Sequence, residues 1–200
     1  MADEETGCSR AMGEFDTVLA DYLFGSLEYF WPFNEENLME LLVRRVAPGG
    51  TLLFIGREPF AYPTSRAFKA LPEASRLVLE TERLRDGAMV LSHQRAYREF
   101  PERAIREALA RRGLVVEARA FFRTRHTARS LAGQLDWAAA EARRVPDASL
   151  SAALLKRVEE VRAGAASCEG LRKGHYLGGN YALVCSRVEG SEAARAEGGR

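Results

Sequence analysis

The sequence predicts an α/β protein, in which helices cover a largely parallel sheet. Residues 15–20 and 51–55 are short apolar runs rich in β-branched residues, as expected of buried strands. A segment with helical periodicity joins them, and such β-α-β units are almost always parallel and right-handed. The alternation continues over residues 101–122, where a helical pattern is followed by another strand pattern. An all-α or all-β fold is therefore not expected.

The first β-α-β unit has recognisable boundaries. Residues 15–20 predict a strand buried on both faces. Asn34 is a candidate N-cap, followed by two glutamates in the first helical turn, and Phe33 is placed to pack on Leu38 as a hydrophobic staple. Apolar residues then recur at helical spacing up to Val46, and the Pro48-Gly49-Gly50 sequence ends the helix before the strand at 51–55.

The rest of the chain continues this pattern with one departure. Pro72 opens a predicted helix that reaches toward Leu91, and a second helix begins at Pro101 and ends at Gly113. Strands are expected at 114–122 and 181–188. Between them, apolar stripes predict a helical hairpin over residues 127–165. We expect one domain over 14–188, with disordered tails at 1–13 and 189–200.

The composition is that of a globular protein, with 46% hydrophobic and 28% charged residues. The formal net charge is +1 and no basic block stands out, so nucleic acid is not an expected partner. No apolar run is long enough to span a bilayer, and the chain lacks the pattern of a signal peptide, so we expect a cytoplasmic protein without a membrane partner. Its three cysteines are widely spaced, which is typical of free thiols.

The most informative position is the carboxyl end of the first predicted strand. Asp21 and Tyr22 follow this strand directly, and in open α/β sheets ligands bind at that edge. A carboxylate there can accept a hydrogen bond from an amine or hydroxyl nucleophile. A purely structural alternative stays open, in which Asp21 caps the next turn and Tyr22 packs with its hydroxyl satisfied.

Two phrases of the sequence resemble class I S-adenosylmethionine-dependent methyltransferases. The first is Ala20-Asp21-Tyr22-Leu23 after a strand, and the second runs from Val46-Ala47-Pro48-Gly49-Gly50 to Gly56. The resemblance implies a partial Rossmann-like sheet with the family's fourth to seventh strands, the last of them antiparallel. It also implies that S-adenosylmethionine is the cofactor, that residues 20–23 lie beside it, and that Asp21 is the catalytic residue.

The resemblance also has a gap. The family's first three strands, its glycine-rich cofactor loop and the acidic residue that holds the ribose are missing, and the hairpin at 127–165 is an insertion. Three explanations stay open: a fragment, a site completed by another chain, or a lost activity. The alternative function is a non-catalytic methyltransferase-like module that binds a partner or serves as a scaffold. Because the first strand would have an open edge, a homodimer is one expected outcome.

Secondary candidates lie further along the chain. Arg123 and His126 follow the predicted end of a strand and are candidate substrate residues, because arginine binds carboxylates and phosphates well. Tyr22 is a third candidate contact with the methyl acceptor, a small molecule or a protein of unknown identity. The three histidines are far apart in sequence, so no metal site is expected. Cys185 lies inside a strand and is expected to be inert.

Overall fold

The computed structural model describes residues 13–187, so the predicted tails lie largely outside the described residues. The described chain divides into two compact units. The first contains residues 13–58, 99–121 and 180–187, and the second contains residues 59–98 and 122–179. Each unit is described by itself below.

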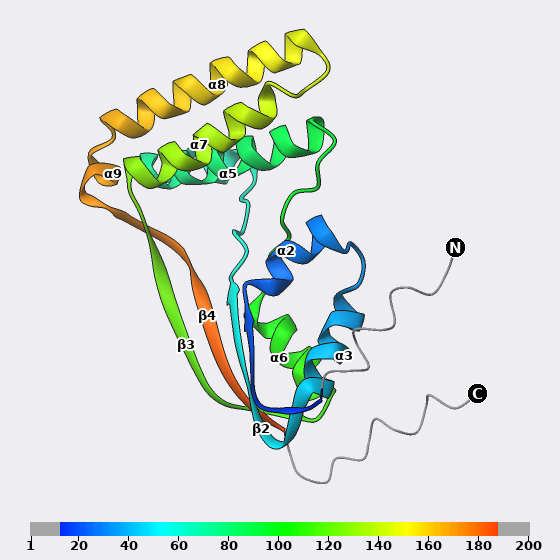
Figure 1. The fold of residues 1–200 in the computed structure, drawn as a ribbon. Coiled ribbons are helices and arrows are strands. Elements are labelled where there is room, and N and C mark those ends of the chain that lie inside the picture. The colour runs from blue at the N-terminus through cyan, green and yellow to red at the C-terminus, as the bar shows by residue number, and fades with distance from the viewer. Residues whose placement is uncertain (1–12, 188–200) are drawn as a thin grey trace, which may run out of the picture. The chain divides into compact units, whose positions relative to one another are not determined.

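One open sheet of four strands confirms the predicted α/β class (Figure 1). Its strands are β1 (Phe15–Asp21), β2 (Val46–Arg57), β3 (Leu114–His126) and β4 (His175–Arg187), in the order β1-β2-β4-β3. β1 pairs in parallel with β2, with Val18 opposite Leu52. β4 pairs with β2 in the antiparallel sense, as predicted for the last strand. Antiparallel β4 thus lies between β2 and β3.

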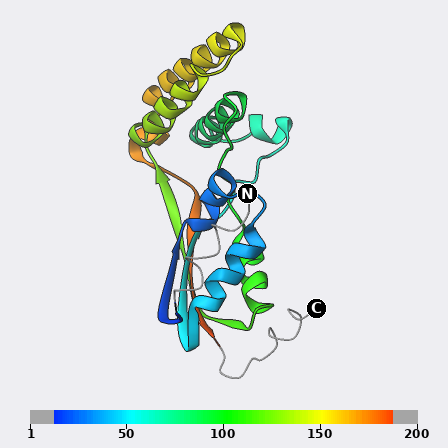
Figure 2. The ribbon, with the colours of Figure 1, turned by 45° about the vertical axis from the view of Figure 1, so that its right-hand side comes forward.

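In the first unit, three helices pack on one face of this sheet (Figure 2). They are α2 (Leu23–Phe30), α3 (Glu35–Arg45) and α6 (Glu102–Ala110). Their apolar faces meet the side chains of β2 and β4 that point the same way. The buried residues of this core are Ala20, Phe24, Met39, Val43, Val46, Leu52, Phe54, Ile105, Ala108, Leu109, Leu114, Tyr181, Leu183 and Cys185.

The expectation that β1 is buried on both faces was wrong. Phe15 is 47% exposed and Leu19 is 59% exposed, whereas Ala20 is fully buried. The physical reason is position: β1 lies at one edge of the sheet and pairs only with β2 among the described residues. The apolar run in the sequence correctly indicated a strand, but sequence periodicity does not report whether a strand has a second neighbour.

The start of α3 also differs in detail from the prediction. Asn34 is the N-cap residue, yet its side chain makes no capping hydrogen bond. Its amide instead donates to the Pro32 carbonyl over 3.0 Å, and its oxygen accepts a hydrogen bond from Asn37. Phe33 is 75% exposed and does not form the expected staple. The backbone of Phe33 has a φ of +63°, in the left-handed region that a bulky residue rarely adopts.

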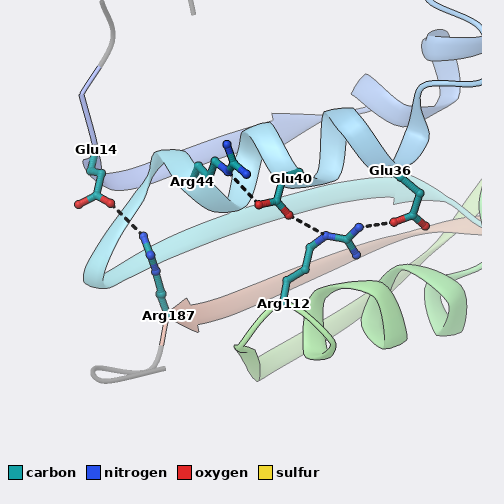
Figure 3. A network of polar contacts seen from close by, with 6 residues as sticks. All are labelled: Glu14, Glu36, Glu40, Arg44, Arg112 and Arg187. Atoms are coloured by element: carbon teal, nitrogen blue, oxygen red, sulfur yellow. Dashed lines mark hydrogen bonds and ion pairs between the residues drawn. The ribbon is translucent and has the colours of Figure 1, made fainter. Parts of the chain in front are cut away.

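Charged side chains connect α3 to the turn after α6 (Figure 3). The Arg112 guanidinium contacts the carboxylate of Glu36 and lies 3.4 Å from that of Glu40. Glu40 is also paired with Arg44 on the same helix, at 2.8 Å. The Arg112 side chain is only 16% exposed but that of Glu36 is 75% exposed, so water shields this ion pair from the glutamate side.

The second unit is mainly helical and contains the predicted hairpin. Its helices are α4 (Ser65–Lys69), α5 (Glu73–Leu91), α7 (Ala128–Ala142), α8 (Ala148–Ser167) and α9 (Glu169–Lys173). The N-cap residues of the hairpin helices α7 and α8 are Thr127 and Asp147, whose side chains accept hydrogen bonds from the first helical turn. Both helices and α5 contribute to a separate core that includes Leu77, Leu135 and Val158.

Candidate functional site

The carboxyl end of β1 is fixed by backbone hydrogen bonding. Asp21 is the last residue of the strand and lies opposite Ile55 of β2. The N–H of Tyr22 donates to the Ile55 carbonyl over 3.0 Å, so Tyr22 is also held to the sheet. Tyr22 then adopts a left-handed conformation, with φ 48° and ψ 19°, and the chain turns into α2. The side chains of Asp21 and Tyr22 therefore emerge from a defined backbone.

α2 is anchored beneath this turn by aromatic packing. The Phe24 ring lies 5.3 Å from that of Phe54 and 5.9 Å from that of Phe100, measured between centroids. Phe24 and Leu27 face the core, whereas Tyr22 and Leu23, which precede Phe24, are accessible. Tyr22 is 44% exposed and Leu23 is 38% exposed. The predicted cluster of residues 20–23 thus combines a buried Ala20 with three accessible side chains.

Sequence reasoning missed a second carboxylate at this position. A β-carbon built on Gly25 would lie 2.7 Å from Oε2 of Glu99, so the Glu99 carboxylate sits against the first turn of α2. Glu99 lies far from Gly25 in the chain, and no local pattern links the two. The one available signal is the glycine itself, which is unusual inside a short helix and marks a close approach.

The electrostatics of Tyr22 reflect these neighbours. Partial burial raises the pKa of the Tyr22 phenol above its usual value, and the carboxylates of Asp21 and Glu99 raise it further. Arg57, at the end of β2, acts in the opposite direction. The phenol consequently stays protonated at neutral pH and is available to donate a hydrogen bond. Asp21, Tyr22, Arg57 and Glu99 thus form one electrostatically connected cluster in the first unit.

This coupling gives a testable prediction. Glu99→Gln removes a negative charge near the phenolate and is expected to lower the pKa of Tyr22, whereas Arg57→Met is expected to raise it. An alkaline absorbance titration of each variant, compared with the same variant carrying Tyr22→Phe, isolates this phenol from the other five tyrosines. Glu117→Gln on β3 serves as a charge-matched control. An unchanged pKa in both site variants would contradict the proposed cluster.

The candidate substrate residues Arg123 and His126 belong to the second unit. They were expected in a loop, but β3 continues to His126 and both lie within the strand. β4, the neighbour of β3 in the sheet, likewise begins earlier than the predicted strand at 181–188, at His175. The candidate site described above is built on residues of the first unit alone.

The two residues have different surroundings. Arg123 is exposed, and its guanidinium lies over the ring of Tyr176 at 5.1 Å. His126 is only 8% exposed, and its Nε2–H donates to the Leu177 carbonyl over 3.0 Å. Arg123 is therefore accessible to a ligand, whereas one ring nitrogen of His126 is engaged with the backbone.

The described residues give less support to a metal site, a reactive cysteine or a membrane-spanning helix. Over residues 13–187, His, Cys, Asp and Glu side chains do not gather in groups of three that could hold a metal ion. Burial, reinforced by Glu117, raises the pKa of the Cys185 thiol to about 11, so this cysteine is inert as predicted. Among the described helices, none combines the length and apolarity needed to cross a membrane.

Searches of protein-family models and of curated proteins find no match to the chain. Several solved structures are similar. A candidate methyltransferase from Bacillus halodurans is 16% identical, with a TM-score of 0.46, and 89% of this chain covers 71% of that one. The YcgJ protein from Bacillus subtilis is 13% identical, with a TM-score of 0.46, and 89% of this chain covers 66% of it.

A third similar structure is an S-adenosylmethionine-dependent methyltransferase from Geobacter sulfurreducens in complex with S-adenosylhomocysteine. It is 13% identical, with a TM-score of 0.36, and 86% of this chain covers 58% of it. The chain thus spans less than two thirds of the length of YcgJ and of the Geobacter enzyme. Similarities at this level of sequence identity and TM-score assign no activity to the chain.

Proposed function

We propose that the chain is the carboxyl-terminal half of an S-adenosylmethionine-dependent methyltransferase, with the methyl-transfer position at the end of β1. The observation that carries this proposal is the placement of Asp21 and Tyr22. Both leave the carboxyl end of a parallel strand pair, both are accessible, and both are fixed by the hydrogen bond from Tyr22 to Ile55. That edge is where open α/β sheets bind their ligands.

The residues present fit one part of the cofactor. The Asp21 carboxylate suits the ammonium group of its methionine portion, and the first amides of α2 suit the carboxylate, because a helix N-terminus carries partial positive charge. The adenosine portion is different. Among the described positive-φ glycines, Gly49 and Gly178 lie inside β2 and β4, and Gly113 and Gly174 directly precede β3 and β4. None of these four therefore lies between the end of a strand and the start of a helix, as a nucleoside loop requires. The fit is therefore limited to the reacting end of the cofactor.

When bound, the cofactor supplies an electrophilic methyl group attached to a sulfonium. The contribution of this chain is to orient the acceptor and to hold its proton. Asp21 is placed to accept a hydrogen bond, and then the proton, from the attacking amine or hydroxyl. The neutral Tyr22 phenol is placed to donate a hydrogen bond to an acceptor atom other than the attacking one. Leu23, beside them, provides apolar surface that excludes water from the transfer position.

We further propose that the methyl acceptor is a small molecule or a protein and that nucleic acid is not a partner. Within the second unit, Arg123 and His126 are proposed contacts for an anionic group of a substrate, supported by the exposed guanidinium of Arg123. A homodimer is proposed because the edge strand β1 exposes Phe15 and Leu19. The free, buried thiols of Cys168 and Cys185 support a reducing compartment such as the cytoplasm.

A second candidate function is a non-catalytic methyltransferase-like module. It is favoured by the same limited fit, since the described residues contain no glycine-rich turn between a strand and a helix. In that case the cluster around Tyr22 would be a structural feature, and the exposed edge of β1 would serve to bind a partner. The two candidates differ in one measurable property, the binding of cofactor by the isolated chain.

Calorimetric titration of the chain with S-adenosylhomocysteine separates these candidates. We expect saturable binding that Asp21→Ala weakens about tenfold, the typical value of a lost charge-assisted hydrogen bond. Asp16→Ala is the matched control, because Asp16 is an exposed aspartate near the other end of the same strand. Absence of binding by a folded sample, or equal weakening by both substitutions, would reject the proposed cofactor site and favour the module.

A further inference from the structure

The segment after α2 exposes an unusual amount of aromatic surface. Four of the five residues 29–33 are aromatic, and we call them the aromatic tip: Tyr29, Phe30, Trp31 and Phe33. Phe33 and Phe30 are 75% and 73% exposed, more than any other large hydrophobic side chain among the described residues. Trp31 and Tyr29 are about 40% exposed. Single exposed apolar residues are common, but four aromatic residues together indicate an interaction surface.

The backbone of the tip is held in a conformation that presents these rings. The Trp31 N–H donates to the Leu27 carbonyl over 2.7 Å, which fixes the end of α2. Asn34 bonds the Pro32 carbonyl across the following turn. Between them, Phe33 occupies the left-handed region, with φ +63°, which is costly for a bulky side chain. Strain at an exposed aromatic residue is consistent with a role for that residue in binding.

The charge around the tip restricts the partner. Residues 22–43 contain no lysine or arginine and carry four glutamates, at positions 28, 35, 36 and 40. Glu36 and Glu40 are paired with Arg112, and Glu40 also with Arg44, both of which lie outside this segment. The segment itself therefore supplies no cationic side chain for anionic lipid or nucleic acid. It is instead compatible with neutral headgroups, particularly those that contain a cation.

We propose that the aromatic tip docks on a zwitterionic lipid surface such as phosphatidylcholine. Tryptophan and tyrosine favour the interface between lipid and water, and phenylalanine adds apolar area that enters the acyl region. The quaternary ammonium of a choline headgroup is attracted to aromatic faces such as those of the tip. The absence of a membrane partner, expected from sequence, relied on the lack of a spanning stretch and of a basic block, and docking of this kind needs neither.

The test uses the fluorescence of Trp31. The chain has two tryptophans, so Trp137→Phe leaves Trp31 as the single reporter. We expect phosphatidylcholine vesicles to shift the Trp31 emission to the blue and to sediment with the protein. Replacing part of the phosphatidylcholine by phosphatidylglycerol should not strengthen binding. Because no cofactor is added, the result is independent of the proposed function.

The decisive variant is Phe30→Ser with Phe33→Asn in the same reporter background. Both side chains are exposed, and asparagine tolerates the left-handed conformation, so the fold should be retained. Loss of these rings should weaken vesicle binding by at least about tenfold. Phe122→Ser, at a 59% exposed phenylalanine elsewhere, should leave binding unchanged. No emission shift, binding only to anionic vesicles, or equal loss in the control would overturn the proposal.

Discussion

Gly56→Ala is expected to destabilise the first unit by about 3 kcal/mol, the upper end of the range for overpacking a well-packed core. A β-carbon at position 56 would overlap the ring and hydroxyl of Tyr181. Tyr181 has no room to move. It is 2% exposed, its ring is parallel to that of Phe54, and its hydroxyl donates to the Phe100 carbonyl over 2.9 Å. Urea unfolding followed by circular dichroism measures the loss.

The control variants identify the cause. Gly13→Ala adds the same methyl group where nothing lies within 4 Å, and it should leave the free energy of unfolding unchanged. Tyr181→Phe alone should cost about 1 kcal/mol through its lost hydrogen bond. Adding Tyr181→Leu to Gly56→Ala frees space for the new methyl group, so the two costs should be less than additive. Full additivity would show that the ring is not the obstacle.

Arg85→Met is expected to cost about 3 kcal/mol in the second unit, because it leaves a buried carboxylate without its cation. Arg85 contacts Glu82 and Asp86 at 2.7 Å each and donates to Gln134 over 2.8 Å. The side chains of Arg85 and Glu82 are 9% and 10% exposed, so water cannot replace the lost guanidinium. Methionine keeps similar volume, which limits the contribution of a cavity.

A second substitution separates charge from packing. Adding Glu82→Gln removes the buried negative charge that Arg85 neutralises, so it should recover most of the stability lost in Arg85→Met. Urea unfolding of the single and double variants measures this recovery. No recovery in the double variant would mean that Arg85 acts through packing alone.

The sequence was most informative where local chemistry determines structure. Pro72 and Pro101 correctly marked the starts of α5 and α6, because proline suits the first turn and cannot sit further inside a helix. The stripe from Leu131 to Ala142 correctly identified the buried face of α7. The antiparallel sense of β4 was also predicted, through the family resemblance.

Features that depend on contacts between residues far apart in the chain could not be predicted from local sequence patterns. The exposure of β1 depends on how many strands lie beside it, and the extension of β3 to His126 depends on pairing with residues about 50 positions away. At the candidate site, Asp21 and Tyr22 were found from their position after a strand. Glu99 was missed because its contact with Gly25 is purely tertiary. The exposed aromatic tip was missed because apolar composition alone predicts burial.

In the function that we propose, the end of β1 binds the reacting portion of the cofactor. The most direct test is amide NMR of the isotope-labelled chain titrated with S-adenosylhomocysteine. We predict that the responding amides cluster at residues 21–25, with further changes at Arg57 and Glu99, and that Asp21→Ala reduces the response. A folded chain in which these amides do not respond, or in which the changes lie elsewhere, would contradict the claim.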